Sequence, residues 1–174
     1  DLAPYAVWEQ AELITVTGGS TDYMNDYAFI VQHLAELKER YELNFLGIGV
    51  DPHNAAGILQ QLEALGCPVV MITQSARSLN DATVALQLLT KSGSIEYDRA
   101  NELLTWSAIN AALVRNSFGE VKIDKKPGAR FKRIDPIDAI IDAHALMLLS
   151  DGGEHGPVDV EDELNNYLAL MGWK

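Results

Sequence analysis

The chain has 174 residues, of which 48% are hydrophobic, and it carries a formal net charge of −12 at pH 7. This length and apolar content suit one well-buried domain, and the negative charge excludes a generally basic nucleic-acid-binding surface, because contacts to phosphate supply non-specific affinity. No apolar run approaches the roughly 20 residues that span a bilayer, and the acidic N-terminus lacks the pattern of a signal peptide. We therefore expect an intracellular protein with no membrane partner.

The N-terminal part of the chain predicts one strand and one helix. Residues 1–10 show no clear period, so we expect an irregular or edge segment. The β-branched stretch 12–17 ends at two glycines and predicts a short strand. Residues 27–41 place apolar side chains at the i, i+3, i+4, i+7 spacing of an amphipathic helix, and candidate N-cap residues precede them at 20–22.

A βαβ unit is predicted in the middle of the chain. The apolar run 44–50 is typical of a buried strand and ends abruptly at Asp51, a helix is predicted over 53–65, and residues 68–73 predict a second buried strand. Cys67, the sole cysteine, is expected to be a small core residue. The short links predict a right-handed unit with parallel strands. Asp51 then lies at the carboxyl end of a strand, where open α/β sheets bind ligands.

The C-terminal half predicts helices around one hairpin. Apolar periodicity predicts helices over 75–89 and 100–111, and a brief strand is predicted within 93–97. Residues 112–124 predict two short strands that turn at Phe118-Gly119. We expect a main domain over residues 1–150, followed over 151–174 by an acidic linker and a C-terminal helix.

The helix predicted from Asp135 to Leu149 is the stretch around which we expect the chain to be organised. Pro136 suits a first helical turn. An apolar stripe follows at helical spacing, formed by Ile137, Ile140, Ile141, Ala145 and Leu148. Asp135 and Asp138 lie one turn apart, so their like charges repel unless something offsets the repulsion. The offset is either the positive end of the helix dipole or a divalent cation.

Three aspartates are candidate metal ligands. If Asp51 at its strand tip converges with Asp135 and Asp138, their oxygens suit Mg²⁺ or Mn²⁺, and two such ions about 3.5–4 Å apart promote in-line attack on a phosphodiester. The alternative for Asp51 is a turn or N-cap role, and for the other two it is compensation of the helix dipole. Asp142, two turns into the helix, is expected to be a solvated acid or a neighbour of the ligands rather than a ligand.

The four histidines show no ligand spacing, so no zinc site is predicted. His53 and His144 are candidates only for a place beside the acids. Six of the thirteen basic residues lie within twelve positions, 122–133. Five of them are candidates to hold DNA phosphates, the alternative being a solvated loop: Lys125, Lys126, Arg130, Lys132 and Arg133. No Gly-x-x-x-x-Gly-Lys-Ser/Thr loop occurs, so the chain does not hold ATP by that device.

Five segments, in their order and spacing, resemble the C-terminal nuclease domain of tailed-phage terminase large subunits. They are Thr15-Val-Thr-Gly-Gly-Ser-Thr-Asp-Tyr23, Gly49-Val-Asp-Pro-His-Asn54, Trp106-Ser-Ala-Ile-Asn-Ala-Ala-Leu-Val114, Ile123-Asp-Lys-Lys126 and Arg133-Ile-Asp-Pro-Ile-Asp-Ala139. The resemblance runs from about Glu12 to Leu149. It implies an α/β, ribonuclease-H-like fold with a mixed central sheet flanked by helices.

The resemblance also implies a function and its partners. It implies a metal-dependent endonuclease that cleaves concatemeric double-stranded DNA during phage packaging in the host cytoplasm, with two Mg²⁺ or Mn²⁺ ions. The partners implied are DNA, an ATPase domain on the same polypeptide, the small terminase subunit and the portal. Matched by motif, the catalytic and metal-binding acids are Asp51, Asp135 and Asp138. The family pattern further implies a first strand with another aspartate, and because Asp1-Leu2 lies too near residue 12 to supply it, we expect a fragment.

Two other interpretations stay open. The Asp-x-x-Asp-Ala pattern at Asp135 also resembles that of Holliday-junction resolvases, which implies a related nuclease. In the second interpretation the chain is a non-catalytic α/β binding module whose carboxylates only cap helices.

Overall fold

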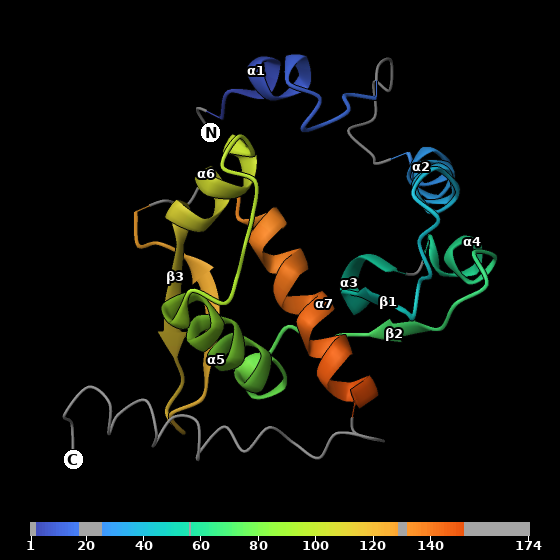
Figure 1. Ribbon diagram of the computed structural model, residues 1–174. Coiled ribbons are helices and arrows are strands. Elements are labelled where there is room, and N and C mark those ends of the chain that lie inside the picture. The colour runs from blue at the N-terminus through green and yellow to red at the C-terminus, as the bar shows by residue number, and fades with distance from the viewer. Residues whose placement is uncertain (1–2, 18–25, 56, 129–131, 152–174) are drawn as a thin grey trace.

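The computed structural model describes residues 3–17, 26–55, 57–128 and 132–151. Its elements, in chain order, are α1 (Tyr5–Gln10), α2 (Tyr27–Arg40), β1 (Ile48–Val50), α3 (Pro52–Ala55), α4 (Leu59–Glu63), β2 (Val69–Met71), α5 (Ala76–Ser92), α6 (Glu102–Asn110), β3 (Ala111–Arg115), β4 (Val121–Lys125) and α7 (Asp135–Asp151). The predicted α/β class is confirmed (Figure 1). None of the helices described is long and apolar enough to cross a membrane.

The strands form two separate pairs. β1 and β2 are parallel, with Ile48 opposite Val69, which confirms the predicted parallel pairing in the middle of the chain. β3 and β4 are antiparallel and confirm the predicted hairpin, whose turn includes Gly119 at a φ of 89°. Over the described residues these are two two-stranded sheets, so the single mixed sheet of the expected fold is not observed as such.

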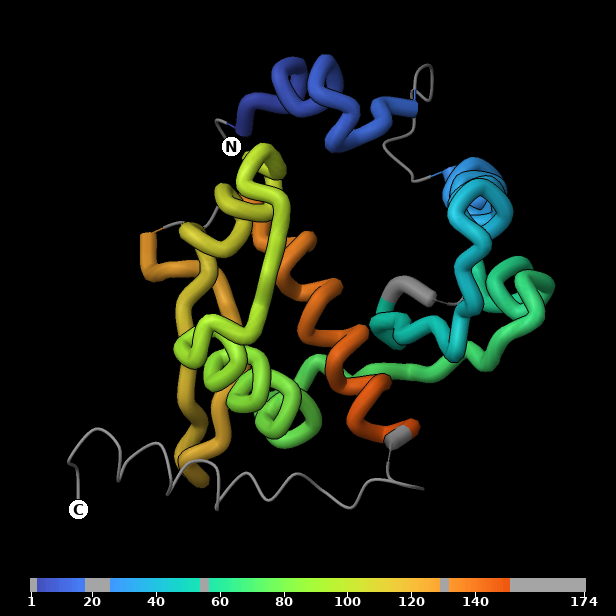
Figure 2. The backbone as a smooth tube through the Cα atoms, in the orientation of Figure 1, coloured from blue at the N-terminus to red at the C-terminus, as the bar shows by residue number. Residues whose placement is uncertain are grey.

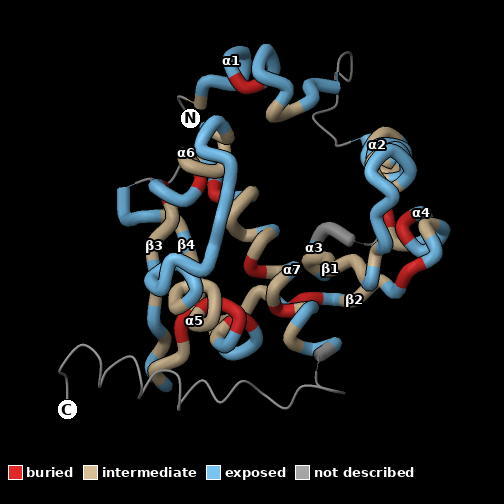
Figure 3. Tube along the Cα trace, viewed as in Figure 1, coloured by how far each residue is buried: buried red, intermediate tan, exposed pale blue. Residues whose placement is uncertain are grey.

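Helix α7 passes between the two strand pairs and joins them, as Figures 1 and 2 show. It contacts α5, α6 and β1. The main core cluster consists of Ile72, Leu79, Ala82, Ile141 and Ala145. The cluster lies on α5, on α7 and directly after β2, and further buried positions lie on α1, α4 and α6 (Figure 3). The predicted apolar stripe of α7 therefore does face the core, with two residues buried and the other three half-buried.

Two glycines let the segment around β1 approach α7 closely. A Cβ built on Gly49 would lie 3.1 Å from Ile72 Cγ1 and 3.5 Å from the carbonyl oxygen of Asp142. A Cβ on Gly47 would lie 3.1 Å from Leu146 Cδ2. Larger side chains would force the strand and the helix apart, so glycine at these positions allows the strand tip, and Asp51 with it, to lie beside α7.

The N-terminal segment differs from the prediction. Instead of an irregular stretch, residues 5–10 form α1, which buries Trp8 against Trp106 of α6 with their ring centroids 5.1 Å apart. Residues 12–17 and 93–97, both expected to contain strands, are not strands. β-branched composition needs a neighbouring strand to pair with, and neither stretch has one in the part of the chain that is described.

The other helices keep their predicted places with one interruption. The helix expected over 53–65 is divided into α3 and α4. Gly57 lies between them. Because a Cβ there would lie only 2.7 Å from the ring of Tyr27 in α2, a glycine at this position lets α2 pack against the segment. Helix α2 is capped by Asp26, whose side chain accepts a hydrogen bond from the Phe29 amide at 3.0 Å. Ser75 caps α5 in the same way, and Cys67 is buried as predicted.

Some predictions fall outside the described residues. They are the N-cap candidates at 20–22, the segment after residue 151 with its predicted helix, and Arg130. The division into a domain over 1–150 and a tail over 151–174 stays a prediction.

Candidate functional site

Asp51 directly follows β1 and is half-buried. Its Oδ1 accepts a hydrogen bond from the His53 amide at 3.0 Å, and His53 Nδ1 lies 3.3 Å from the same oxygen. These contacts fit the turn role considered for Asp51. They also fix the carboxylate at the carboxyl end of a parallel strand, as expected for a site at the edge of the sheet.

Asp135 and Asp138 occupy the first turn of α7. Asp135 is exposed and Asp138 is half-buried. The pKa of Asp138 is raised to about 6, chiefly by burial and then by the charges of Asp142, Asp135 and Asp124, while Lys122 lowers it. Both offsets considered for this repulsion, the positive end of the helix dipole and a divalent cation, stay predictions.

Asp142 has contacts that the sequence did not predict, and they agree with its expected place as a neighbour of the ligands. It is half-buried one turn beyond Asp138, and both of its carboxylate oxygens accept from Gln74 Nε2, at 2.9 and 3.1 Å. Burial raises the pKa of Asp142, the hydrogen bond from Gln74 opposes that shift, and the charge of Asp51 adds to it. Asp142 thus interacts with both Asp51 and Asp138. Its position four residues after Asp138 was the available signal, because such residues share a helix face.

The acids are coupled but not gathered into a ready-made ion site. Among the described residues, no three His, Cys, Asp or Glu side chains are grouped so as to hold a metal ion. The chemistry of the set nevertheless fits a hard divalent cation, since carboxylate oxygens are its preferred ligands and like charges that raise one another's pKa are stabilised by a cation. Convergence of Asp51 with Asp135 or Asp138 on one ion stays a prediction.

The two histidines beside the acids differ in their surroundings. The side chain of His53 is 89% exposed and touches only the edge of the site, through Asp51. His144 is half-buried on α7, and burial lowers its pKa. Its Nε2 atom is buried without a hydrogen-bond partner in the described part of the chain. A neutral imidazole is therefore favoured at His144.

The basic residues extend from β4 to the start of α7. Lys125 ends β4, and Lys126 follows it, with its amide donating to the Asn110 carbonyl at 3.0 Å. Lys132 lies over the Trp106 ring, 6.0 Å from the centroid, and Arg133 is exposed two residues before α7. We call these four residues, together with Arg130, the basic strip. Lys132 and Arg133 precede the helix start that carries Asp135 and Asp138, and Lys132 also packs on Trp106.

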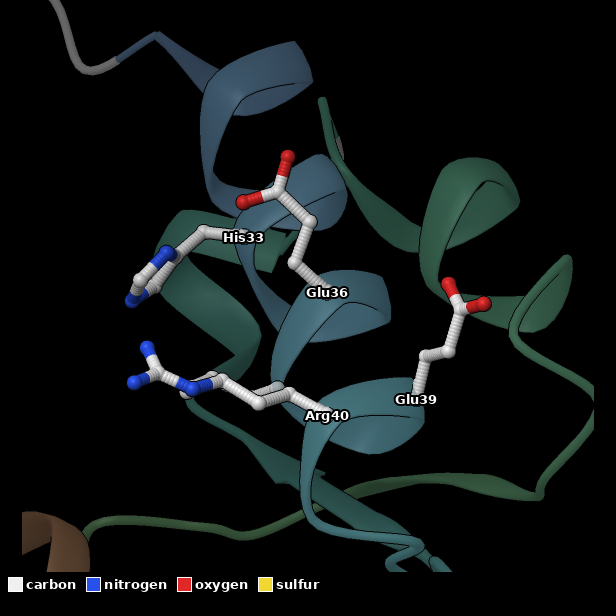
Figure 4. Close-up of a pocket in the computed structure, with 5 residues that line it drawn as sticks. His33, Glu36, Glu39 and Arg40 are labelled. Atoms are coloured by element: carbon white, nitrogen blue, oxygen red, sulfur yellow. The ribbon is translucent and has the colours of Figure 1, made fainter.

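Two hollows in the surface lie apart from these acids. One, of about 250 Å³, is lined by residues of α2 alone, including His33 and Arg40, whose side chains extend to one side while Glu39 extends to the other (Figure 4). The second, of about 410 Å³, lies between β2, α5 and α7 and is mostly apolar, with Met71, Leu148 and Leu149 in its wall. Neither includes Asp51, Asp138 or Asp142.

Comparison with known proteins gives consistent matches. The sequence model of the family described as "Terminase large subunit, endonuclease domain" matches residues 4–151. The large terminase subunit of Enterobacteria phage HK97 is 28% identical over 160 residues, which are 91% of this chain and 29% of that protein. The crystal structure of the HK97 large terminase superposes with a TM-score of 0.70 at 26% identity, covering 83% of this chain and 29% of that one. The chain thus spans less than a third of the length of these relatives.

Proposed function

Because the chain belongs to the terminase large subunit endonuclease domain family, we propose that it cleaves double-stranded DNA with divalent cations, Mg²⁺ or Mn²⁺. The observation that supports this most directly is that the charge of Asp51, at the tip of β1, acts on Asp142 of α7, and that the charge of Asp142 acts on Asp138. An acid at a strand end thus acts on an acid of a helix that is far away in sequence. Acids whose charges act on one another are costly without a counter-ion, which is why they mark functional sites.

The residues proposed to hold the cations are Asp51, Asp135 and Asp138, with Asp142 as an additional acid. Bound cations supply Lewis-acid chemistry for hydrolysis of a phosphodiester, by polarising its oxygens and lowering the pKa of water. Since no three acids among the described residues are grouped so as to hold an ion, we propose that binding includes a movement of their side chains toward one another.

The basic strip supports the choice of DNA as substrate. Lys125 ends β4, Lys126 follows it, and Arg133 lies two residues before Asp135, while Arg130, outside the described residues, belongs to the same stretch of sequence. Lysine and arginine contacts to phosphate position a duplex without reading its bases. We propose that these residues lay the DNA backbone across the acids, and that the strip overcomes locally the repulsion expected from a net charge of −12.

The wider setting follows from the family. We propose that the complete sheet of the intact protein is ribonuclease-H-like, and that this domain acts on concatemeric phage DNA in the host cytoplasm beside an ATPase domain, a small terminase subunit and a portal. A junction-resolving nuclease would use the same acids. Comparing cleavage of linear duplex with cleavage of a four-way junction separates these two activities.

The decisive experiment is metal binding by the purified chain. Millimolar Mn²⁺ is expected to raise the melting temperature, because an ion that binds only the folded state stabilises it by mass action. Asp51→Asn is expected to remove most of that increase, whereas Asp98→Asn, on an exposed turn, is expected to keep it. A melting curve that Mn²⁺ leaves unchanged in the parent would favour the non-catalytic binding module.

A further inference from the structure

Gln74 connects the end of β2 to α7. It lies three residues after β2 and directly before Ser75, the N-cap of α5, so its backbone is held by the elements on both sides. Its side-chain Nε2 donates to Asp142 Oδ1 at 2.9 Å, to Asp142 Oδ2 at 3.1 Å and to the Ile72 carbonyl at 3.2 Å. The amide therefore fixes the carboxylate against the strand end that also carries the core residue Ile72.

Lys122 holds Gln74 in turn. Lys122 lies on β4, and its Nζ donates to the backbone carbonyl of Gln74 at 3.1 Å in a half-buried position. Its charge also lowers the pKa of Asp138, against the effect of the surrounding acids. One lysine thus reaches two parts of the acid cluster: through Gln74 to Asp142, and through space to Asp138.

We propose that Gln74 is a positioning residue of the nuclease site, which holds the Asp142 carboxylate where it faces Asp51 and Asp138, and that Lys122 keeps Gln74 in place. This inference rests on the nuclease function proposed above. Neither residue contacts substrate in this scheme; each acts through Asp142.

The hydrogen-bonding capacity of the groups supports this role. An ionised carboxylate has about four acceptor positions on its two oxygens, and a single amide nitrogen uses only part of them. Gln74 can therefore fix the orientation of Asp142 and still leave oxygen lone pairs for a cation. A lysine ammonium in the place of Gln74 would neutralise the acid, whereas a neutral amide orients it and keeps its charge. Partners that orient metal ligands in this way typically contribute about 10- to 100-fold in metal affinity.

The test measures Mn²⁺ affinity by electron paramagnetic resonance on the folded chain, well below its melting temperature. Gln74→Leu removes the donor at similar volume and is expected to weaken Mn²⁺ binding by about tenfold or more. Lys122→Met is expected to weaken it in the same direction, and Lys122→Arg, which keeps the charge and donors, to restore most of the affinity. If Gln74→Leu does not fold, Gln74→Met replaces it.

Two matched controls remove the same kinds of contact elsewhere. Gln32 Nε2 donates to Glu36 Oε1 at 2.8 Å, and Lys38 Nζ donates to the Leu65 carbonyl at 2.8 Å, and neither contact involves Asp51, Asp135, Asp138 or Asp142. Gln32→Leu and Lys38→Met are expected to leave Mn²⁺ affinity unchanged, whatever they do to the melting temperature. This separates positioning from a general loss of stability, which would lower melting temperatures alone.

The outcomes distinguish this inference from the function on which it rests. If Asp51→Asn weakens Mn²⁺ binding and Gln74→Leu does not, the positioning role is wrong and the nuclease proposal stands. If the parent chain binds no Mn²⁺, both are overturned. Weakened binding in Gln74→Leu and Lys122→Met, with recovery in Lys122→Arg and no change in the controls, supports the positioning role.

Discussion

The backbone of Gly49 lies against that of Asp142: a Cβ placed on Gly49 would be 3.5 Å from the Asp142 carbonyl oxygen and 3.1 Å from Ile72 Cγ1. Gly49 lies in β1 and Asp142 in α7, two elements that carry candidate ligands. A Cβ at position 49 would press on the Ile72 side chain and touch the Asp142 carbonyl, so a larger side chain there would disturb the packing of β1 against α7.

Replacing Gly49 with valine is expected to destabilise the chain by about 1–3 kcal/mol, because extra methyl groups in a packed contact force the backbone or neighbouring side chains to move. Gly49→Ala is expected to cost less. Urea unfolding gives the comparison. Valine is the better strand former, so a stability order with valine above alanine would show that the space beside position 49 is open.

Ser107→Ala is expected to loosen the start of α7. Ser107 is fully buried on α6, and its Oγ accepts a hydrogen bond from the Ile137 amide at 3.1 Å. Removing the acceptor leaves a buried N–H of the first turn unpaired, which costs about 1–2 kcal/mol. Ser150→Ala, at an exposed position near the other end of α7, is the control. Equal urea midpoints for the two variants would contradict this role.

Asp138→Asn is expected to stabilise the metal-free chain near neutral pH while weakening Mn²⁺ binding. Burial and the neighbouring acids raise the pKa of Asp138 to about 6, so the folded state binds its proton more tightly than the unfolded state does. The stabilisation that this group gives the folded state is therefore fully present below about pH 4 and is lost as the pH rises through 6. Asparagine carries no charge and so removes that loss. At pH 8 the free energy of unfolding of Asp138→Asn is expected to exceed that of the parent by about 1 kcal/mol, a value that allows for partial solvation of the site.

Unfolding curves at pH 5 and pH 8 in chelator provide the measurement. The advantage of Asp138→Asn over the parent is expected to be larger at pH 8, and Asp81→Asn, at an exposed position on α5, serves as the control. Destabilisation by Asp138→Asn at both pH values would instead identify Asp138 as a structural cap of α7.

Replacing Lys125 and Lys126 together with alanine is expected to weaken DNA binding and its salt dependence. Two or three phosphate contacts give a slope of log affinity against log salt of roughly −2 to −3, and the double variant is expected to flatten it by about one to two units. Fluorescence anisotropy in Ca²⁺ measures binding with little cleavage. Arg40→Ala with Arg99→Ala makes the same change in net charge at exposed positions elsewhere. Equal effects of the two double variants would exclude a specific DNA path along the strip.

The elements that were predictable are those whose signals are local. The βα turn at Asp51, the hairpin turn at Gly119 and the amphipathic period of α7 each depend on a few neighbouring residues. Helix α1 was missed because its only buried residue is Trp8, whose partner Trp106 lies almost a hundred positions later. The strand expected over 12–17 failed for a related reason, since β-branched residues form strands only where a neighbouring strand pairs with them.

For the candidate site, too, the residues with local sequence signals were predictable and the contacts between distant elements were not. Asp51, Asp135 and Asp138 could be selected from a strand tip and a helix start, because both signals are encoded next to the residues themselves. The spacing of four residues places Asp142 on the same helix face as Asp138, but its links to Gln74 and Asp51 could not be predicted, since they exist only where α7 is docked against β1. The role of Lys122 depends in the same way on the packing of β4 against α5 and the segment before it.

Gln74 and Asp142 are 68 positions apart in the chain, so the acid cluster exists only when α7 is docked. The same docking places Ile141 and Ala145 of α7 in the main core cluster. Burial of these apolar residues therefore offsets the repulsion among the acids, and the core and the site form or come apart together. A cation that binds the docked acids stabilises the core by mass action, although it contacts none of the core residues.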